Sequence, residues 1–404
     1  MPRIPELRVV SNAPERKSPE DISLIRGGPF YRAQTITHLI APDRWNLRRR
    51  LVFALAVGWL PLVLVTLLFH PGHLMVLLGD YLVYSRMVIA VPVLIIGQLL
   101  MESRFRTIVT HTREANLLKG ENRARFDEVI ARIVRLRNSA IPELIIVLVV
   151  YVHIAMMWHG RVEMVAGSTM SWVVQRMGST LYLTPAGWYY ALVSQFLYQF
   201  LIGLTLWKWL LWSVFLFRLS RLPLDLFATH PDRRGGLGFL GLSPIGFAPL
   251  VFATTAAIGA TWRYQILHNG AHLSDFKIPA IVLLFLILIT ALAPLVFFVP
   301  KLAALRRNGL SQYGTLGQLH SREFEDKWIL NRSGHESEFL AAPEVSTLTD
   351  FAASYENIQG MKPFPGDKGS LIGLALAVAL PLLPTVLAEI PLTTVLKDLL
   401  SALR

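Results

Sequence analysis

The chain contains no cysteine, and it carries few charged residues for its length. Only 16% of its 404 residues are Asp, Glu, Lys or Arg, whereas a soluble domain carries about 25%. The absence of cysteine excludes disulfides, cysteine metal ligands and a thiol nucleophile. The scarcity of charge, together with 53% hydrophobic residues, is typical of membrane proteins rather than soluble ones.

Long apolar stretches make up much of the chain. A helix needs about 20 mostly apolar residues to cross a bilayer. Seven stretches come close to or exceed this length, at residues 51–69, 83–101, 140–158, 186–217, 243–262, 279–300 and 371–389. The sequence therefore predicts an all-α, polytopic transmembrane helical bundle with about seven spans. The fourth stretch is longer than a bilayer requires, so it is expected to tilt or to project into the cytoplasm.

The basic residues alternate between successive loops. The net charge is +12, and 31 of the 39 Lys and Arg residues fall on one set of loops, against six on the other set. Cytoplasmic loops are rich in Lys and Arg, so the N-terminus is predicted inside and the C-terminus outside. Anionic membrane lipids are the expected partners of this charge, and nucleic acid is not an expected partner.

Three regions follow from this pattern. Residues 1–50 are predicted to be a cytoplasmic segment that is partly disordered, because they are polar and lack periodicity. Residues 51–389 form the transmembrane domain, with cytoplasmic amphipathic helical insertions at 102–138 and 301–370. Residues 390–404 are predicted to form an interfacial C-terminal helix.

Several short motifs resemble those of a known family. They are Thr229-His-Pro-Asp-Arg-Arg-Gly-Gly-Leu-Gly-Phe-Leu240, Tyr313-Gly-Thr-Leu, Arg322-Glu-Phe-Glu-Asp-Lys-Trp328, Met361-Lys-Pro-Phe-Pro and Leu380-Pro-Leu-Leu-Pro384. With them, the chain resembles an uncharacterised family of bacterial multi-pass inner-membrane proteins, chiefly over residues 220–404. The resemblance implies a bacterial cytoplasmic membrane and about seven helices, and it assigns no activity and no catalytic residue.

Lys208 is the most conspicuous charge inside a predicted span. It precedes Arg218 by ten residues, which corresponds to roughly 15 Å of helix. A charge at such a depth costs at least a few kcal/mol unless it is paired or hydrated. It therefore indicates an ion or proton pathway, or an anion-binding site. The alternative is that the side chain snorkels to the cytoplasmic headgroups.

Glu143 is the predicted partner of Lys208. It lies near the start of the third span, where a long lysine side chain from an antiparallel neighbour could reach it. The alternative is that Glu143, which follows Pro142 in the first helical turn, is favoured there by the helix dipole.

A polar face on the fourth span contains Gln195, Tyr198, Gln199 and Thr205. This face would suit the wall of a pore or a substrate site. The alternative, which we favour, is that the face makes ordinary hydrogen bonds between helices, each worth about 0.6 kcal/mol.

The loop before the fifth span is the candidate for cytoplasmic chemistry. His230 and Asp232 could act as a base and its orienting carboxylate, while Arg233, Arg234 and the glycine amides could hold a phosphate. A tight turn stabilised by Asp232, with the arginines as cytoplasmic anchors, is the alternative. The histidines show no convincing metal-ligand spacing, and neither a metal nor another cofactor is predicted.

Three functions remain open at this point. The leading hypothesis is an inner-membrane channel or transporter for an ion or small solute, because Lys208, the polar face and prolines within most spans are typical of such proteins. The second is a membrane-embedded enzyme that acts on a lipid or a phosphorylated headgroup at the cytoplasmic face. The third is a membrane scaffold or sensor. The sequence leaves the oligomeric state open, including a homo-oligomer.

Overall fold

The computed structural model describes residues 23, 26–41, 45–115, 117–165, 172–177, 180–330 and 343–390. The predicted interfacial helix at the C-terminus, apart from residue 390, lies outside the described residues, and so does most of the predicted disordered segment at the N-terminus.

The described part of the chain consists almost entirely of helices. Six helical stretches are long and apolar enough to cross a membrane, and a seventh is counted when the pair Glu121–Asn138 and Ile141–Met157, bent by 43°, is taken as one span. This confirms the predicted all-α polytopic bundle of about seven spans.

Most of the spans consist of several consecutive helices. In chain order they contain α3 (Leu47–Gly58) and α4 (Leu60–Phe69); α6 (Tyr81–Tyr84), η2 (Ser85–Ala90) and α7 (Val91–Glu114); α9 (Ile141–Val165); α10 (Pro185–Tyr189), η3 (Tyr190–Ser194) and α11 (Gln195–Arg221); η4 (Gly238–Leu242), η5 (Pro244–Phe247) and α12 (Ala248–His268); η6 (Leu273–Phe276), α13 (Lys277–Leu292), η7 (Ala293–Phe298), α14 (Val299–Phe324) and η8 (Glu325–Leu330); and α17 (Lys368–Val386). The remaining elements connect or flank the spans: α2 (Pro29–Ile36), η1 (Pro71–His73), α5 (Leu74–Leu78), α8 (Glu121–Asn138), the antiparallel strands β1 (Val174–Met177) and β2 (Thr180–Leu183), and α16 (Pro343–Gln359).

The breaks within spans fall close to prolines or at π-helical turns. Pro61 follows the bend between α3 and α4, Pro92 follows the π-helix η2, and Pro294 lies in the 3₁₀ segment η7. Proline removes a backbone N–H and so disfavours a continuous α-helix. The second π-helix, η3, divides the fourth span, and isolated π turns are frequent at functional sites.

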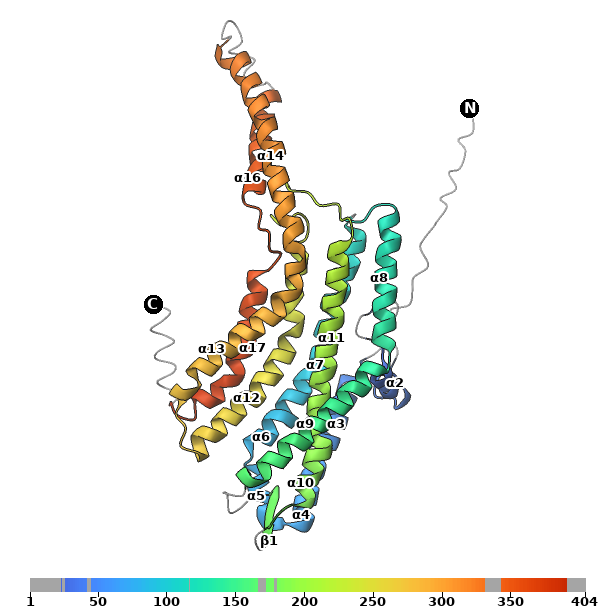
Figure 1. Ribbon diagram of the computed structural model, residues 1–404, viewed down its shortest axis with the longest axis vertical. Coiled ribbons are helices and arrows are strands. Elements are labelled where there is room, and N and C mark those ends of the chain that lie inside the picture. The colour runs from blue at the N-terminus through green and yellow to red at the C-terminus, as the bar shows by residue number, and fades with distance from the viewer. Residues whose placement is uncertain are drawn as a thin grey trace, which may run out of the picture.

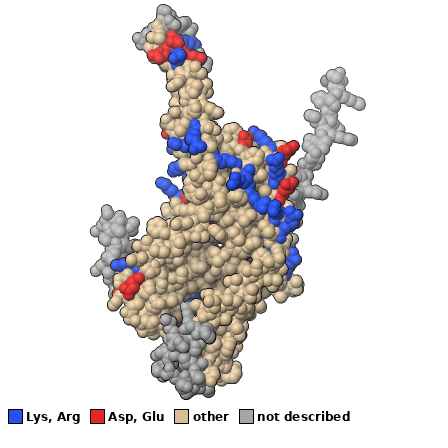
Figure 2. All heavy atoms as spheres, in the orientation of Figure 1, with Lys and Arg blue, Asp and Glu red and all other residues tan. Residues whose placement is uncertain are grey.

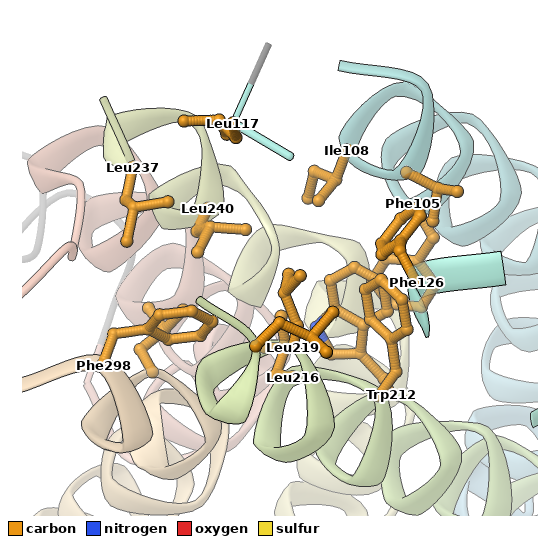
Figure 3. Close-up of a cluster of buried hydrophobic side chains, with 14 of the residues drawn as sticks. Phe105, Ile108, Leu117, Phe126, Trp212, Leu216, Leu219, Leu237, Leu240 and Phe298 are labelled. Carbon is orange, nitrogen blue, oxygen red and sulfur yellow. The ribbon is translucent and has the colours of Figure 1, made fainter. Parts of the chain in front are cut away.

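A core of buried aromatic and aliphatic side chains holds the half of the molecule that contains α8 (Figure 3). Phe105 of α7 stacks on Trp212 of α11 with ring centroids 4.1 Å apart. Phe126 of α8 and Phe298 of η7 belong to the same core, and both are buried. This packing fixes α7, α8 and α11 against one another beyond the start of α9.

The outer surface of the bundle is apolar where lipid is expected. Ile278, Phe285 and Ile289 on α13 are between 60% and 73% exposed. Contiguous apolar surface of this kind marks contact with a membrane or another protein. The lower half of the visible face is almost free of charge, whereas Lys and Arg gather near α8 and the base of α14 (Figure 2). This distribution agrees with the predicted cytoplasmic side.

One helical hairpin extends beyond the rest of the molecule. Helix α14 continues out of the bundle and packs against α16, and the two form the projection at the top of Figure 1. Tyr313 of α14 stacks on Phe351 of α16 with ring centroids 6.1 Å apart. The predicted insertion 301–370 is therefore helical over most of its described residues, and residues 360–367 form the turn-rich connection from α16 to α17.

Candidate functional site

A buried polar cluster lies where the first turn of α3 meets α2 and α7. Arg50, at its centre, is only 3% exposed. Its Nε donates a hydrogen bond to Gln34 Oε1 at 2.9 Å, and its Nη2 donates to Gln98 Oε1 at 2.7 Å. Arg50 therefore links the N-terminal helix to two spans. We call the following residues the inner cluster: Gln34, Arg50, Gln98, Glu102, Glu143 and Lys208.

Glu102 lies one turn further along α7 and is also buried. Its Oε2 accepts a hydrogen bond from Ser23 Oγ at 2.6 Å, and its Oε1 lies 3.8 Å from Arg26 Nε. The guanidinium groups of Arg26 and Arg50 lie over the ring of Trp45, at 5.0 and 5.6 Å from its centroid. The chain before the first span is thus folded into the cluster.

Lys208 enters the cluster from α11. Arg50, Glu102 and Glu143 are the charged side chains close enough to interact with it electrostatically. Its ammonium group makes no ion pair or hydrogen bond within the described part of the chain. The half-buried Lys208 is therefore surrounded by charges without a direct counterion.

Lys208 lies at the level of the first turn of α9. The electrostatic neighbour Glu143 lies in that turn, and α11 continues past it to Arg221. Figure 1 shows this extension running beside α8, which lies beyond the start of α9. The inner cluster therefore lies near the start of the predicted third span, on its predicted cytoplasmic side.

Glu143 contacts the N-terminal helix rather than forming an ion pair with Lys208. Its Oε2 accepts the backbone N–H of Phe30 at 2.7 Å, in the first turn of α2. A Cβ at Gly28 would lie 2.5 Å from Glu143 Oε1, and Gly28 has a φ of +91°, so this close approach requires glycine. On the same side, Arg137 donates to the carbonyl of Ser23. The carboxylate thus fixes the start of α2.

Both the cations and the carboxylates of the cluster have groups without a hydrogen-bond partner. Glu102 and Glu143 each accept one hydrogen bond, and Glu102 Oε1 is buried without a hydrogen-bond partner among the described residues. Arg50 donates only to neutral amide oxygens, and its Nη1 is buried with no partner among the described residues. The arrangement can therefore accept a further negatively charged or polar group.

A second polar cluster lies nearer the opposite end of the second and fourth spans. Arg86, on the π-helix η2, donates from Nη1 to Tyr190 Oη at 2.8 Å and to Gln195 Oε1 at 3.4 Å. Tyr190 belongs to the π-helix η3, so two irregular turns face each other. Tyr198 lies close enough to interact with Arg86 electrostatically. We call these four residues the outer cluster.

The polar face predicted on the fourth span divides between two environments. Gln195 and Tyr198 are buried in the outer cluster. Gln199 instead contacts His153 of α9, with Oε1 3.0 Å from Nδ1, at an exposed position. Thr205 donates its hydroxyl to the carbonyl of Leu201 on its own helix. The face is therefore not one continuous polar wall.

The loop with His230 and Asp232 forms a closed set of hydrogen bonds. Asp232 accepts the backbone N–H groups of Arg234, Gly236 and Gly238 at 2.7 to 3.1 Å. His230 Nδ1 lies 2.9 Å from Asp232 Oδ1. Burial raises the pKa of Asp232, but the three N–H donors and the nearby His230 outweigh this, and the pKa is lowered overall.

The two arginines of that loop have partners as well. Arg234 Nη2 donates to the carbonyl of Gly366 at 2.6 Å, which ties the loop to the entry of α17, whereas Arg234 Nε is buried without a partner among the described residues. Arg233 Nη2 lies 3.5 Å from Glu356 Oε1 on α16. The backbone oxygen of Arg233 also accepts the N–H of Lys362. Among the residues that the structure describes, no three His, Asp or Glu side chains lie close enough to hold a metal ion.

The sequence singles out Lys208 and Glu143, but it does not single out Arg50 and Glu102, the other charged members of the inner cluster. Arg50 was counted among the basic residues that flank the first span, and Glu102 was placed in a loop. The spacing of Gln98 and Glu102, four residues apart on one helix face, was the available signal. Neither the burial of Arg50 nor the docking of α2 has a local sequence signal.

Comparisons with known proteins supply no further assignment. No protein-family model, no curated protein and no solved structure matches this chain.

Proposed function

We propose that this chain is a channel or transporter of the bacterial inner membrane that moves an ion or small solute. One observation carries the proposal: the second and fourth spans share two polar clusters, one towards each end of the spans, and each cluster contains a cation. Arg86 and Gln98 both lie on the second span, and Gln195 and Lys208 both lie on the fourth. Ionisable residues inside membrane bundles are costly and usually mark pathways or binding sites.

The separation of the clusters suits a pathway across most of the bilayer. Gln98 follows Arg86 by twelve positions, which correspond to roughly 18 Å along the helix. Buried apolar side chains, among them Val91, Leu94 and Leu201, lie between the clusters. Such a layer would keep ions out in this conformation, so transport requires the second and fourth spans to shift.

The two π-helices favour such a shift. The segments η2 and η3 lie at the outer cluster, one on each of the two spans. A π turn holds one residue more than the α-helical ladder needs, so a small rearrangement can move it along the helix. The hydrogen bond between Arg86 and Tyr190 would couple the two spans during that movement.

The test is flux through the purified protein in proteoliposomes. Gradients of H⁺, K⁺, Na⁺, Cl⁻ and inorganic phosphate would be applied in turn, and currents or indicator dyes recorded. We expect flux for at least one of them and its loss in Lys208→Met. Lys368→Met is the matched control, because Lys368 is exposed at the start of α17. The proposal fails if two results are obtained together. The wild-type protein conducts none of these ions, and inner membranes from cells with and without the gene transport small solutes equally.

The enzymatic hypothesis has less support from the loop on which it rests. The hydrogen bonds of Asp232 and the contact of Arg234 with Gly366 agree with a structural turn. A comparison of the lipids from cells with and without the gene tests it: a change in one phospholipid class would favour the enzyme.

The scaffold hypothesis is supported by the hairpin of α14 and α16. Leu316 and Leu319 are both more than half exposed on its surface, far from the spans. Stoichiometric co-purification of another protein, lost when both leucines are replaced by serine, would favour this function over transport.

A further inference from the structure

The burial of Arg50 is unusual because no carboxylate neutralises it directly. Arg50 is only 3% exposed, and both of its hydrogen bonds go to uncharged amide oxygens. A buried charge is normally paired or bound to a ligand, since its transfer out of water is costly. The third nitrogen of the Arg50 guanidinium, Nη1, is also buried and has no partner among the described residues.

Lys208 adds a second positive charge beside Arg50. The two cations are close enough to repel each other electrostatically. Glu102 and Glu143 lie near Lys208, but neither forms an ion pair with it. One oxygen of each carboxylate accepts a hydrogen bond, from Ser23 and from the N–H of Phe30, and Glu102 Oε1 lies 3.8 Å from Arg26 Nε without a hydrogen-bond partner among the described residues. Two neighbouring cations thus lack a direct counterion at the same place.

Two further arginines lie beside this pair. Arg26 lies 3.8 Å from Glu102, and Arg137 contacts the carbonyl of Ser23. A phosphate group carries roughly −1.5 to −2 at pH 7, which is the charge needed to compensate both Arg50 and Lys208.

The donors also suit the shape of a phosphate group. A guanidinium presents its N–H groups as a planar fork that fits two oxygens, and an ammonium contacts a third from another direction. A halide can accept hydrogen bonds from both groups, but a single spherical atom does not match the two oxygens that the planar fork fits. A neutral solute would leave both charges uncompensated.

We propose that Arg50 and Lys208 together bind the phosphate group of an anionic ligand at the predicted cytoplasmic boundary of the membrane. The proposal deepens the transport function and rests on it, in that the bound group would be the cargo. The phosphate can come from a soluble anion or from a lipid headgroup, because the cluster lies at the level where headgroups are expected.

The experiment measures binding and flux on the same full-length protein. Thermal unfolding is followed in neutral detergent with inorganic phosphate or with chloride at equal ionic strength. It is then repeated in nanodiscs of phosphatidylcholine with and without phosphatidylglycerol. We expect the melting temperature to rise with phosphate, or with phosphatidylglycerol alone if a headgroup is the source. A chloride effect equal to that of phosphate, or no effect of either phosphate source, overturns the proposal.

Two variants show whether the pair is responsible. Lys208→Gln removes one cation and keeps a polar side chain of similar length, and it should weaken phosphate binding by about tenfold, the effect of losing one charge-assisted contact. Arg50→Gln should weaken phosphate binding to the same extent, but this substitution also breaks the contacts with α2. If Arg50→Gln misfolds, Lys208→Gln is the decisive variant. Lys368→Met, at the exposed start of α17, should bind as the wild type does. Unchanged phosphate binding in Lys208→Gln contradicts the proposal.

Flux in proteoliposomes made from the same preparations separates the two claims. Flux of another ion without phosphate binding retains the transport function and overturns the phosphate site. Phosphate binding that depends on Lys208, without any flux, removes the transport function and retains the site.

Discussion

Two basic regions of this molecule differ in how their polar groups are satisfied. In the loop that contains Asp232, the carboxylate accepts three backbone N–H groups, and Arg234 donates from Nη2 to a carbonyl while its buried Nε has no partner among the described residues. In the inner cluster, Arg50 has a buried donor without a partner, and Lys208 has neither a hydrogen bond nor an ion pair within the described residues. From the sequence, Lys208 indicates an ion or proton pathway or an anion-binding site, and the loop indicates a phosphate site or a structural turn.

The difference separates a structural role from a functional one. A carboxylate that accepts several backbone N–H groups stabilises one conformation of its loop, and those N–H groups are no longer available to a ligand. A buried cation that lacks a counterion is costly, and a ligand can remove that cost. The inner cluster is therefore the better candidate for a site, although the loop contains more of the residue types associated with catalysis.

The largest expected effect is a contrast between substitutions of Lys208 and Arg234, one of which lowers flux and the other stability. Lys208→Met should reduce flux by about 100-fold or more, because a change of about 2.7 kcal/mol in the barrier corresponds to that factor. Arg234→Met should lower the melting temperature but leave the flux per folded molecule intact. Flux and thermal unfolding of both variants measure this; loss of flux in Arg234→Met alone would reverse the comparison.

The next effect concerns the stability contributed by Asp232. Asp232→Ala leaves three backbone N–H donors without their acceptor, which should cost about 2 kcal/mol because the loop is only half-buried. Titration with a denaturing detergent measures this change. Asp326→Ala, on the exposed end of the hairpin, is the control and should have no measurable effect.

The same carboxylate predicts a dependence of stability on pH. The pKa of Asp232 in the folded protein lies below its usual value of 3.8. The folded state therefore binds the proton less readily than the unfolded state, so the stabilisation is present above about pH 4 and is lost as the pH falls through the folded-state pKa. Asp232→Asn should lose this part of the acid sensitivity. Melting curves between pH 3 and 7 would show identical slopes for both proteins if the prediction is wrong.

A smaller effect is expected from Glu143. Glu143→Leu removes the acceptor for the N–H of Phe30, and loss of such a cap typically costs about 1 kcal/mol. Hydrogen exchange in α2 should then accelerate by about fivefold, the factor that corresponds to this energy. Glu114→Leu, at the exposed end of α7, is the control. Unchanged exchange in α2 would show that Glu143 does not hold that helix.

The smallest effect is expected at the contact of His153 with Gln199. This hydrogen bond is exposed at the surface of the bundle, and such bonds contribute about 0.6 kcal/mol on average. Gln199→Leu should therefore leave both flux and stability nearly unchanged. A loss of flux comparable to that of Lys208→Met would place Gln199 in the pathway and restore the continuous polar face predicted from the sequence.

The sequence predicted the helical class and the spans because both depend on local composition. Hydropathy and the alternation of basic loops are properties of neighbouring residues, and they need no knowledge of packing. Lys208 was also recognisable, since a charge within an apolar stretch is conspicuous. The loop around Asp232 was recognisable as a turn, but the sequence could not show whether its donors were free.

The inner cluster could not be predicted because its contacts join distant segments. Arg50 meets Gln98, 48 positions away, and Ser23 meets Glu102, 79 positions away. Locally, Arg50 is one of three consecutive arginines before an apolar stretch, and nothing distinguishes it from Arg48 or Arg49. Only the docking of α2 against the spans determines which of these side chains becomes buried.

Chemical accessibility tests most directly whether the inner cluster is an open site. The chain has no native cysteine, so Gln98→Cys and Leu94→Cys, one turn apart on α7, can each be labelled with a water-soluble methanethiosulfonate from the cytoplasmic side. The account predicts that position 98 reacts on the order of tenfold faster than position 94, because a polar site admits water and a packed apolar layer excludes it. Inorganic phosphate should slow the reaction at position 98 alone. Equal and slow labelling at both positions, unaffected by phosphate, would contradict it.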